Sequence, residues 1–156
     1  MSKRLFKGKD IIGNWYSGNM SVLEKDLHMG AGIIRAGSYI SNSCGSPFAY
    51  QIRPETVGQF TGLYAGVFNS LCGDKEYDEI YEGDKISVTY ATQGMSNSHE
   101  HTITGVVAFK NGSFVVEWDF PKKGKYKYQT LNSVKTLGDC GVVIKIIGNI
   151  HDNPRD

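Results

Sequence analysis

The clearest feature of the sequence is a regular alternation of apolar and polar residues in its second half. Residues 85–90 read Lys-Ile-Ser-Val-Thr-Tyr and alternate with period two, which is typical of a strand with one face buried. Residues 142–147 form an apolar run that only Lys145 interrupts, and they predict another strand. Both segments therefore predict core strands of a β-structure.

The strongest hairpin signal lies between these two strands. Residues 105–109 and 114–118 are rich in Val and Phe, and Asn111-Gly112 lies between them. Asn-Gly is favoured in tight hairpin turns because both turn positions need a positive φ. We predict a hairpin here, with Phe109, Phe114 and Val116 supplying apolar surface.

The first half predicts short strands separated by turns. Residues 5–7 and 15–16 are predicted to form an opening hairpin, and residues 38–41 and 48–52 a second pair. Residues 64–79 are expected to form a loop or a short helix, because their apolar residues recur at a weakly helical spacing. Residues 30–37 contain three glycines and receive no assignment.

Composition supports an all-β fold. β-Branched and aromatic residues outnumber the strong helix formers, and the 19 glycines suit many turns and bulges. We expect one domain over residues 1–156, with N-terminal hairpins in 1–53 and a small SH3-like or barrel-like core in 54–156.

Charge and cysteine content narrow the cellular setting. The net charge of +1 gives no bulk field that favours nucleic acid or membrane. There is no apolar run of the roughly 20 residues needed to span a membrane, and we expect no secretion signal behind the polar first residues. Three separated cysteines, Cys44, Cys72 and Cys140, are expected to be free thiols in a reducing cytoplasm.

Residues 122–128 are the first candidate site. They contain four lysines interleaved with tyrosines, a combination that can neutralise phosphates and stack on bases. The alternative is a solvated hairpin tip whose lysines prevent edge-to-edge pairing. The residues concerned are Lys122, Lys123, Lys125, Tyr126, Lys127 and Tyr128, with Trp118 and Phe120 nearby.

Two further candidates have weaker patterns. His99 and His101 lie at i and i+2, so on a strand they point the same way, as paired metal ligands can. Zinc needs further ligands, which His28, His151 or Asp152 could supply; the alternative is a solvated loop. The segment 74–84 holds six acidic residues and one lysine. Such a run is typical of either a carboxylate acid/base site or a charged loop.

Three long stretches are distinctive as they stand in the sequence. Residues 54–63 read Pro-Glu-Thr-Val-Gly-Gln-Phe-Thr-Gly-Leu, residues 79–86 read Glu-Ile-Tyr-Glu-Gly-Asp-Lys-Ile, and residues 147–154 read Ile-Gly-Asn-Ile-His-Asp-Asn-Pro. Together they closely resemble the YopX family of phage and prophage proteins. The motif positions, read as structural, are Gly58, Thr61, Gly62, Glu82, Gly83, Asp84, Gly148 and Asn149.

The resemblance covers nearly the whole chain, since residues 6–9 and 15–18 also look like the opening of the family. It departs from the family in the longer segment 64–79, which leaves any role of that segment open. The resemblance implies an all-β fold with a barrel-like core, a phage or prophage origin and self-association. It implies no reaction.

We therefore expect a non-enzymatic, phage-derived accessory or binding protein in the cytoplasm of a bacterial host. Expected partners are further copies of the chain and a host or phage protein, with no cofactor and no membrane. The acidic segment 74–84 and the basic segment 122–127 could dock head to tail, with Phe120, Tyr126 and Tyr128 as apolar contacts. The alternatives are a small barrel that binds single-stranded nucleic acid or RNA, and a metal-dependent hydrolase.

Overall fold

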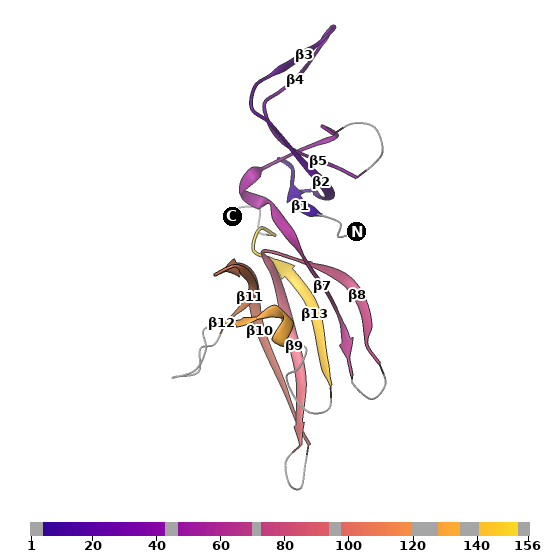
Figure 1. Cartoon of the computed structure of the whole chain (residues 1–156), viewed down its shortest axis with the longest axis vertical. Coiled ribbons are helices and arrows are strands. Elements are labelled where there is room, and N and C mark those ends of the chain that lie inside the picture. Colours follow the sequence, from indigo (N-terminus) through magenta and orange to yellow (C-terminus); the bar gives the residue numbers. More distant parts are fainter. Residues whose placement is uncertain are drawn as a thin grey trace. The chain divides into compact units, whose positions relative to one another are not determined.

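The computed structural model describes residues 5–42, 47–69, 73–93, 98–119, 128–134 and 141–152. These residues are mostly antiparallel strands (Figure 1), so the all-β prediction is confirmed. The chain divides into two compact units. Unit 1 comprises residues 1–60 with 151–156, and unit 2 comprises residues 61–150.

Unit 1 is a set of short antiparallel strands. Its hydrogen-bonded order runs from the start of β7 through β1, β2 and β5 to β6, while β3 and β4 form a separate ribbon. The predicted opening hairpin and the predicted pairing of residues 38–41 with 48–52 are both confirmed, as β1–β2 and β5–β6. The elements are β1 (Phe6–Lys9), β2 (Trp15–Leu23), β3 (Leu27–Met29), β4 (Gly32–Ile34), β5 (Gly37–Ser41), β6 (Tyr50–Ile52), the short 3-10 turn η1 (Pro54–Thr56) and the start of β7 (Gly58–Phe68).

The close approach of Ile52 to the backbone of β1 explains the glycine at position 8. A Cβ atom on Gly8 would lie only 2.5 Å from the Cδ1 atom of Ile52. Ile52 and Ile40 are buried on this side of the strands. Gly8 therefore lets two isoleucines pack directly on the backbone of β1.

Unit 2 is built on a larger antiparallel sheet. Its order is β12-β11-β10-β9-β13-β7, and β8 also pairs with β7. The remaining elements are β8 (Lys75–Tyr81), β9 (Asp84–Gln93), β10 (Ser98–Lys110), β11 (Ser113–Trp118), β12 (Tyr128–Thr130), the single turn α1 (Leu131–Val134) and β13 (Val142–Asn149).

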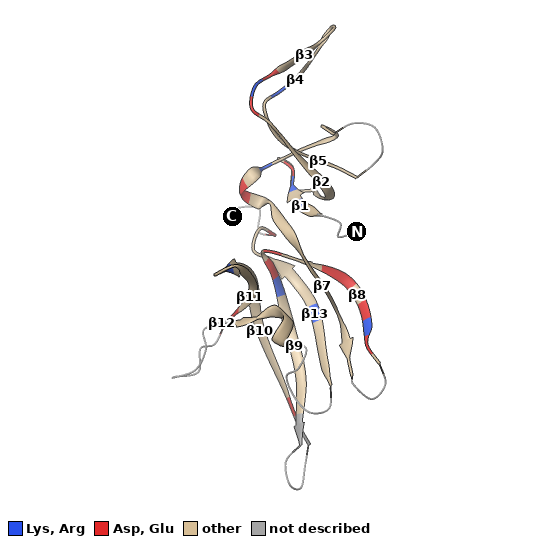
Figure 2. Cartoon of the chain, in the orientation of Figure 1, with Lys and Arg blue, Asp and Glu red and all other residues tan. Residues whose placement is uncertain are grey.

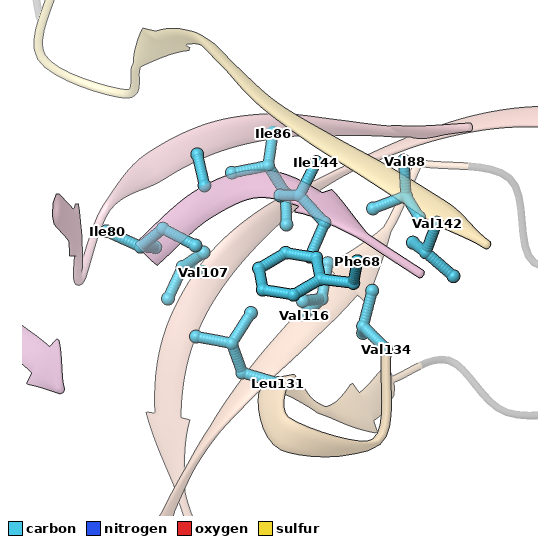
Figure 3. Packing of buried hydrophobic residues seen from close by; sticks show 11 residues of the cluster. Phe68, Ile80, Ile86, Val88, Val107, Val116, Leu131, Val134, Val142 and Ile144 are labelled. Carbon is cyan, nitrogen blue, oxygen red and sulfur yellow. The ribbon is translucent and has the colours of Figure 1, made fainter. Parts of the chain in front are cut away.

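The core of unit 2 lies on one face of this sheet (Figure 3). The period-two alternation places Ile86 and Val88 of β9 inward, and both are fully buried. Leu131 and Val134 of α1 pack against the same cluster, so this short turn covers part of the face. The labelled members of the cluster are Phe68, Ile80, Ile86, Val88, Val107, Val116, Leu131, Val134, Val142 and Ile144.

The Asn-Gly hairpin is confirmed. Asn111 and Gly112 have φ values of 51° and 82°, and Lys110 pairs with Ser113 directly before and after them. Phe109 and Phe114 face each other across the hairpin with ring centroids 5.0 Å apart.

The expectation of a loop or short helix over residues 64–79 is wrong for the described part of that segment. β7 continues to Phe68, and β8 begins at Lys75. Pairing between β7 and β8 satisfies the backbone in this region, and Phe68 is buried in the core. The pairing partners are far from this segment in the sequence, and their contacts outweigh the local helical spacing that predicted a helix.

Candidate functional site

Three of the distinctive sequence segments meet in a buried polar cluster of unit 2. Asp84 is fully buried and accepts a hydrogen bond from the backbone N–H of Tyr81 at 2.8 Å. It also accepts one from the Nδ2 atom of Asn149 at 2.9 Å. Thr61, from the first segment, donates its hydroxyl to the carbonyl of Ile80 at 2.8 Å.

The backbone around Gly83 completes this cluster. Gly83 has a φ of 93°, a left-handed conformation that glycine adopts without steric cost. Its N–H donates to the carbonyl of Val107 at 2.7 Å, and its own carbonyl accepts from the N–H of Ile150 at 2.9 Å. The turn is thus bonded to β10 and to the residue that follows β13.

A buried carboxylate needs hydrogen-bond donors around it, because burial without them is costly. Tyr81 and Asn149 supply two such donors to Asp84. Through these contacts, Thr61, Gly83, Asp84 and Asn149 hold separate strands of unit 2 together.

A second feature is the exposed tip of the β1–β2 hairpin in unit 1. Ile11 and Ile12 are 88% and 80% exposed. The Asp10 carboxylate accepts hydrogen bonds from the backbone N–H groups of Ile12 and Asn14, at 3.0 and 2.8 Å. The loop is held in shape while it presents two large apolar side chains to solvent.

Trp15 follows this tip and carries cations on its ring. The Nζ atoms of Lys7 and Lys9 lie 5.0 and 5.6 Å from the ring centroid, and the indole N–H donates to Asp152 at 3.1 Å. Lys9 also donates to the backbone carbonyl of His151. These contacts attach residues 151–152 to the start of unit 1.

A third feature is the ribbon of β3 and β4, called here the β3–β4 ribbon (residues 27–34). Leu27 and Ile34 pair across it, as do His28 and Ile33. Met29 and Ile33 are 60% and 48% exposed, and the ribbon is a two-stranded sheet by itself. Within the part of the chain that the structure describes, no third strand pairs with this ribbon, and Met29 and Ile33 face solvent.

Asp26 and Arg35 close the base of the ribbon. Their side chains form an ion pair at 3.0 Å, and Asp26 accepts from the N–H of Ala36 at 2.8 Å. The hydrogen bond from Ala36 and then the one from Arg35 hold the pKa of Asp26 below its usual value.

Comparison with known families identifies the chain. The YopX protein family matches residues 19–155, which is most of the sequence. This chain belongs to the YopX family. No match was found among curated proteins or among solved structures.

The predicted metal ligands of this YopX protein lie in both units. His101 lies in unit 2 beside the ring of Tyr90, with centroids 5.3 Å apart, while His28 and His151 belong to unit 1. His99 follows the register of β10, opposite Thr92. Among the described residues, no three His, Cys, Asp or Glu side chains group as metal ligands would.

The basic candidate falls largely outside the described residues of the YopX protein. This applies to Phe120 and residues 122–127, and Tyr128 is placed only as the first residue of β12, paired with Glu117. Trp118 is half-buried against the core of unit 2. Nucleic-acid binding by this stretch stays a prediction, and the three cysteines also lie outside the described residues.

The acidic residues of segment 74–84 in the YopX protein have different surroundings. Figure 2 shows acidic residues along β8, where Glu76 and Asp78 are exposed. Glu79 accepts the hydroxyl of Tyr81 at 2.6 Å, and Asp84 points into the buried cluster. The run of acids in the sequence therefore separates into solvated and structural residues.

No sequence pattern predicts the exposure of the hairpin tip or of the β3–β4 ribbon in this YopX protein. Ile11 and Ile12 lie in the loop of the predicted opening hairpin, and Ile33 lies in the segment 30–37 that received no assignment. In the described chain, no helix is long and apolar enough to cross a membrane.

Proposed function

We propose that this YopX protein is a non-enzymatic accessory protein of phage origin that acts by binding, and that it associates with further copies of itself. It works in the cytoplasm of the bacterial host, where a host or phage protein is a second possible partner. Membership in the YopX family supports the phage origin.

The observation that carries the binding role is the exposed apolar surface of the β3–β4 ribbon. Leu27, Met29 and Ile33 are 37%, 60% and 48% exposed. Exposed clusters of large apolar residues mark interaction surfaces more often than isolated ones do. A two-stranded ribbon is also marginally stable in water by itself, so a partner surface would stabilise its fold.

The charges beside this surface are compatible with binding of a second copy of the chain. The residues at the base of the ribbon, Glu24, Lys25, Asp26 and Arg35, carry two negative and two positive charges. Two such ribbons can therefore meet about a two-fold axis without a net like-charge contact. Apolar burial would hold the pair, and the mixed charges would set its register.

Light scattering coupled to size-exclusion chromatography tests self-association. The wild-type protein at tens of micromolar should elute as an oligomer in both low and high salt. The double variant Leu27→Ser/Met29→Ser should shift toward the monomer, because it removes apolar surface that is already exposed. A wild-type monomer under both conditions would exclude self-association.

Ile147→Ser is the matched control for this experiment. Ile147 is also a large exposed apolar residue, at 57%, but it lies on β13 in unit 2. Its replacement should leave the oligomer intact. Bound nucleic acid would appear as raised absorbance at the nucleic-acid maximum of the purified protein and would favour the nucleic-acid alternative.

A further inference from the structure

Unit 2 carries an open depression on the face of its sheet opposite the core. Cross-strand register places Val143 of β13 between Val67 of β7 and Thr89 of β9. Ala91 of β9 lies opposite Glu100 of β10. All five residues line this depression, whose volume is about 210 Å³.

The lining combines an apolar floor with a single carboxylate. Val67, Ala91 and Val143 supply methyl groups, while the Thr89 hydroxyl is already paired with that of Thr102 at 3.0 Å. Glu100 is exposed and makes no hydrogen bond or ion pair with any residue that the structure describes. The carboxylate is thus available to a ligand.

Carboxylates and lysines both lie near the depression, and Glu100 is the one carboxylate among its lining residues. Asp74 accepts a hydrogen bond from the backbone N–H of Asn69, a lining residue, at 3.1 Å. Lys145 of β13 lies two residues from the lining Val143 and pairs with Ser87 of β9, which is four residues along β9 from Ala91, the partner of Glu100. A cation would therefore be attracted to the Glu100 end of the depression.

The size of the depression restricts the ligand. Pockets for drug-sized ligands measure roughly 300–1,000 Å³, so this one is too small for a nucleotide or a large cofactor. Its volume of about 210 Å³ suits a smaller ligand. An unbranched chain of a few carbons ending in one charged group has a similar size.

We propose that this depression binds an aliphatic primary ammonium group. The alkyl chain lies on Val67, Ala91 and Val143, and the ammonium pairs with Glu100. This chemistry is presented by a free alkylamine or by the side chain of a lysine in a peptide. The site shares no residue with the β3–β4 ribbon. The proposal therefore does not depend on the proposed self-association.

Titration of the full-length protein with n-pentylamine, followed by NMR, tests the proposal. The methyl signals of Val67, Ala91 and Val143 should shift saturably, with a dissociation constant of about 1 mM or weaker for a ligand so small. The uncharged analogue n-pentanol should bind more weakly than the amine. Equal binding of the two probes, or no saturable shift, would overturn the proposal.

Variants separate the roles of charge and shape. Glu100→Gln should weaken pentylamine binding by about two- to five-fold, the range expected for one exposed ion pair, and Ala91→Leu should abolish binding by filling the floor. Glu76→Gln removes an exposed carboxylate on β8 and should have no effect. Unchanged binding in Glu100→Gln would refute the assignment of the carboxylate.

N-acetyl-lysine methylamide distinguishes the two sources of the ammonium group. Binding equal to that of pentylamine would support recognition of a lysine side chain on a partner protein. Binding of pentylamine alone would support a free amine as the ligand. If neither probe binds, the depression has no such site.

Discussion

Replacement of Asp84 by alanine should strongly destabilise unit 2. Asp84 is fully buried, and its two donors Tyr81 and Asn149 are each 5% exposed. The substitution leaves the Tyr81 N–H and the Asn149 amide without their acceptor inside the protein. Each buried donor left unpaired costs about 1–3 kcal/mol, which gives a gross loss of about 2–6 kcal/mol.

Part of this loss is offset, because removing a buried charge also removes its desolvation penalty. We therefore expect a net loss of about 2–4 kcal/mol in the free energy of unfolding. That is a large fraction of the about 5–15 kcal/mol that stabilises a typical protein. For a unit of this size the melting temperature should fall by about 10 °C or more.

Urea unfolding followed by tryptophan fluorescence measures this change. Trp118 packs against the core of unit 2, whereas Trp15 lies in unit 1. All variants would therefore carry Trp15→Phe, so that the emission reports unit 2 alone. Asp78→Ala is the matched control, because Asp78 is an exposed carboxylate on β8 and should change stability by at most about 0.5 kcal/mol.

A double-mutant cycle with Asn149→Ala isolates the contact between the two side chains. Direct contact predicts a coupling energy of about 0.5–3 kcal/mol. A loss below about 1 kcal/mol in Asp84→Ala, or additive effects of the two substitutions, would refute the structural role given to the motif.

Three further predictions concern local geometry. Gly112→Val should lower the melting temperature, because φ is +82° at Gly112 and a β-branched residue there costs about 1 kcal/mol or more; an unchanged midpoint would contradict the turn. Gly105→Val should also destabilise unit 2 in thermal denaturation, since even its Cβ would lie 2.6 Å from the carbonyl oxygen of Glu117; wild-type stability would mean that the strands are not this close. The lowered pKa of Asp26 predicts that its bond to Ala36 helps the fold above the unfolded pKa of about 3.9 and is lost as pH falls through the folded pKa. An NMR titration of the Ala36 amide should show this step, and Asp26→Asn should remove it.

The strands of unit 2 were largely predictable because their signals are local. The alternation over residues 85–90 reflects one buried and one solvated face, and this pattern is visible in the sequence without knowledge of the partner strands. The Asn111-Gly112 turn is equally local, because its two positive φ values depend on residue type. Both predictions agree with the structure.

The segment 64–79 was not predictable in this way. Val67, Leu71 and Tyr77 have a weakly helical spacing, but Phe68 enters the core and β7 pairs with β8 and β13. Such pairing depends on residues that are distant in the chain, which a local pattern does not contain. The strand state is therefore a result of tertiary structure.

The candidate sites divide along the same line. The motif segments were recognisable as sequence, and with them the family, but Asp84 and Asn149 are 65 residues apart. Only the pairing of β9 with β13 brings them together. The sequence likewise contains Ile11, Ile12, Met29 and Glu100, yet it does not show which side chains remain exposed. Exposure depends on which other strands cover a face, so the apolar ribbon and the depression beside Glu100 were decided by the tertiary structure alone.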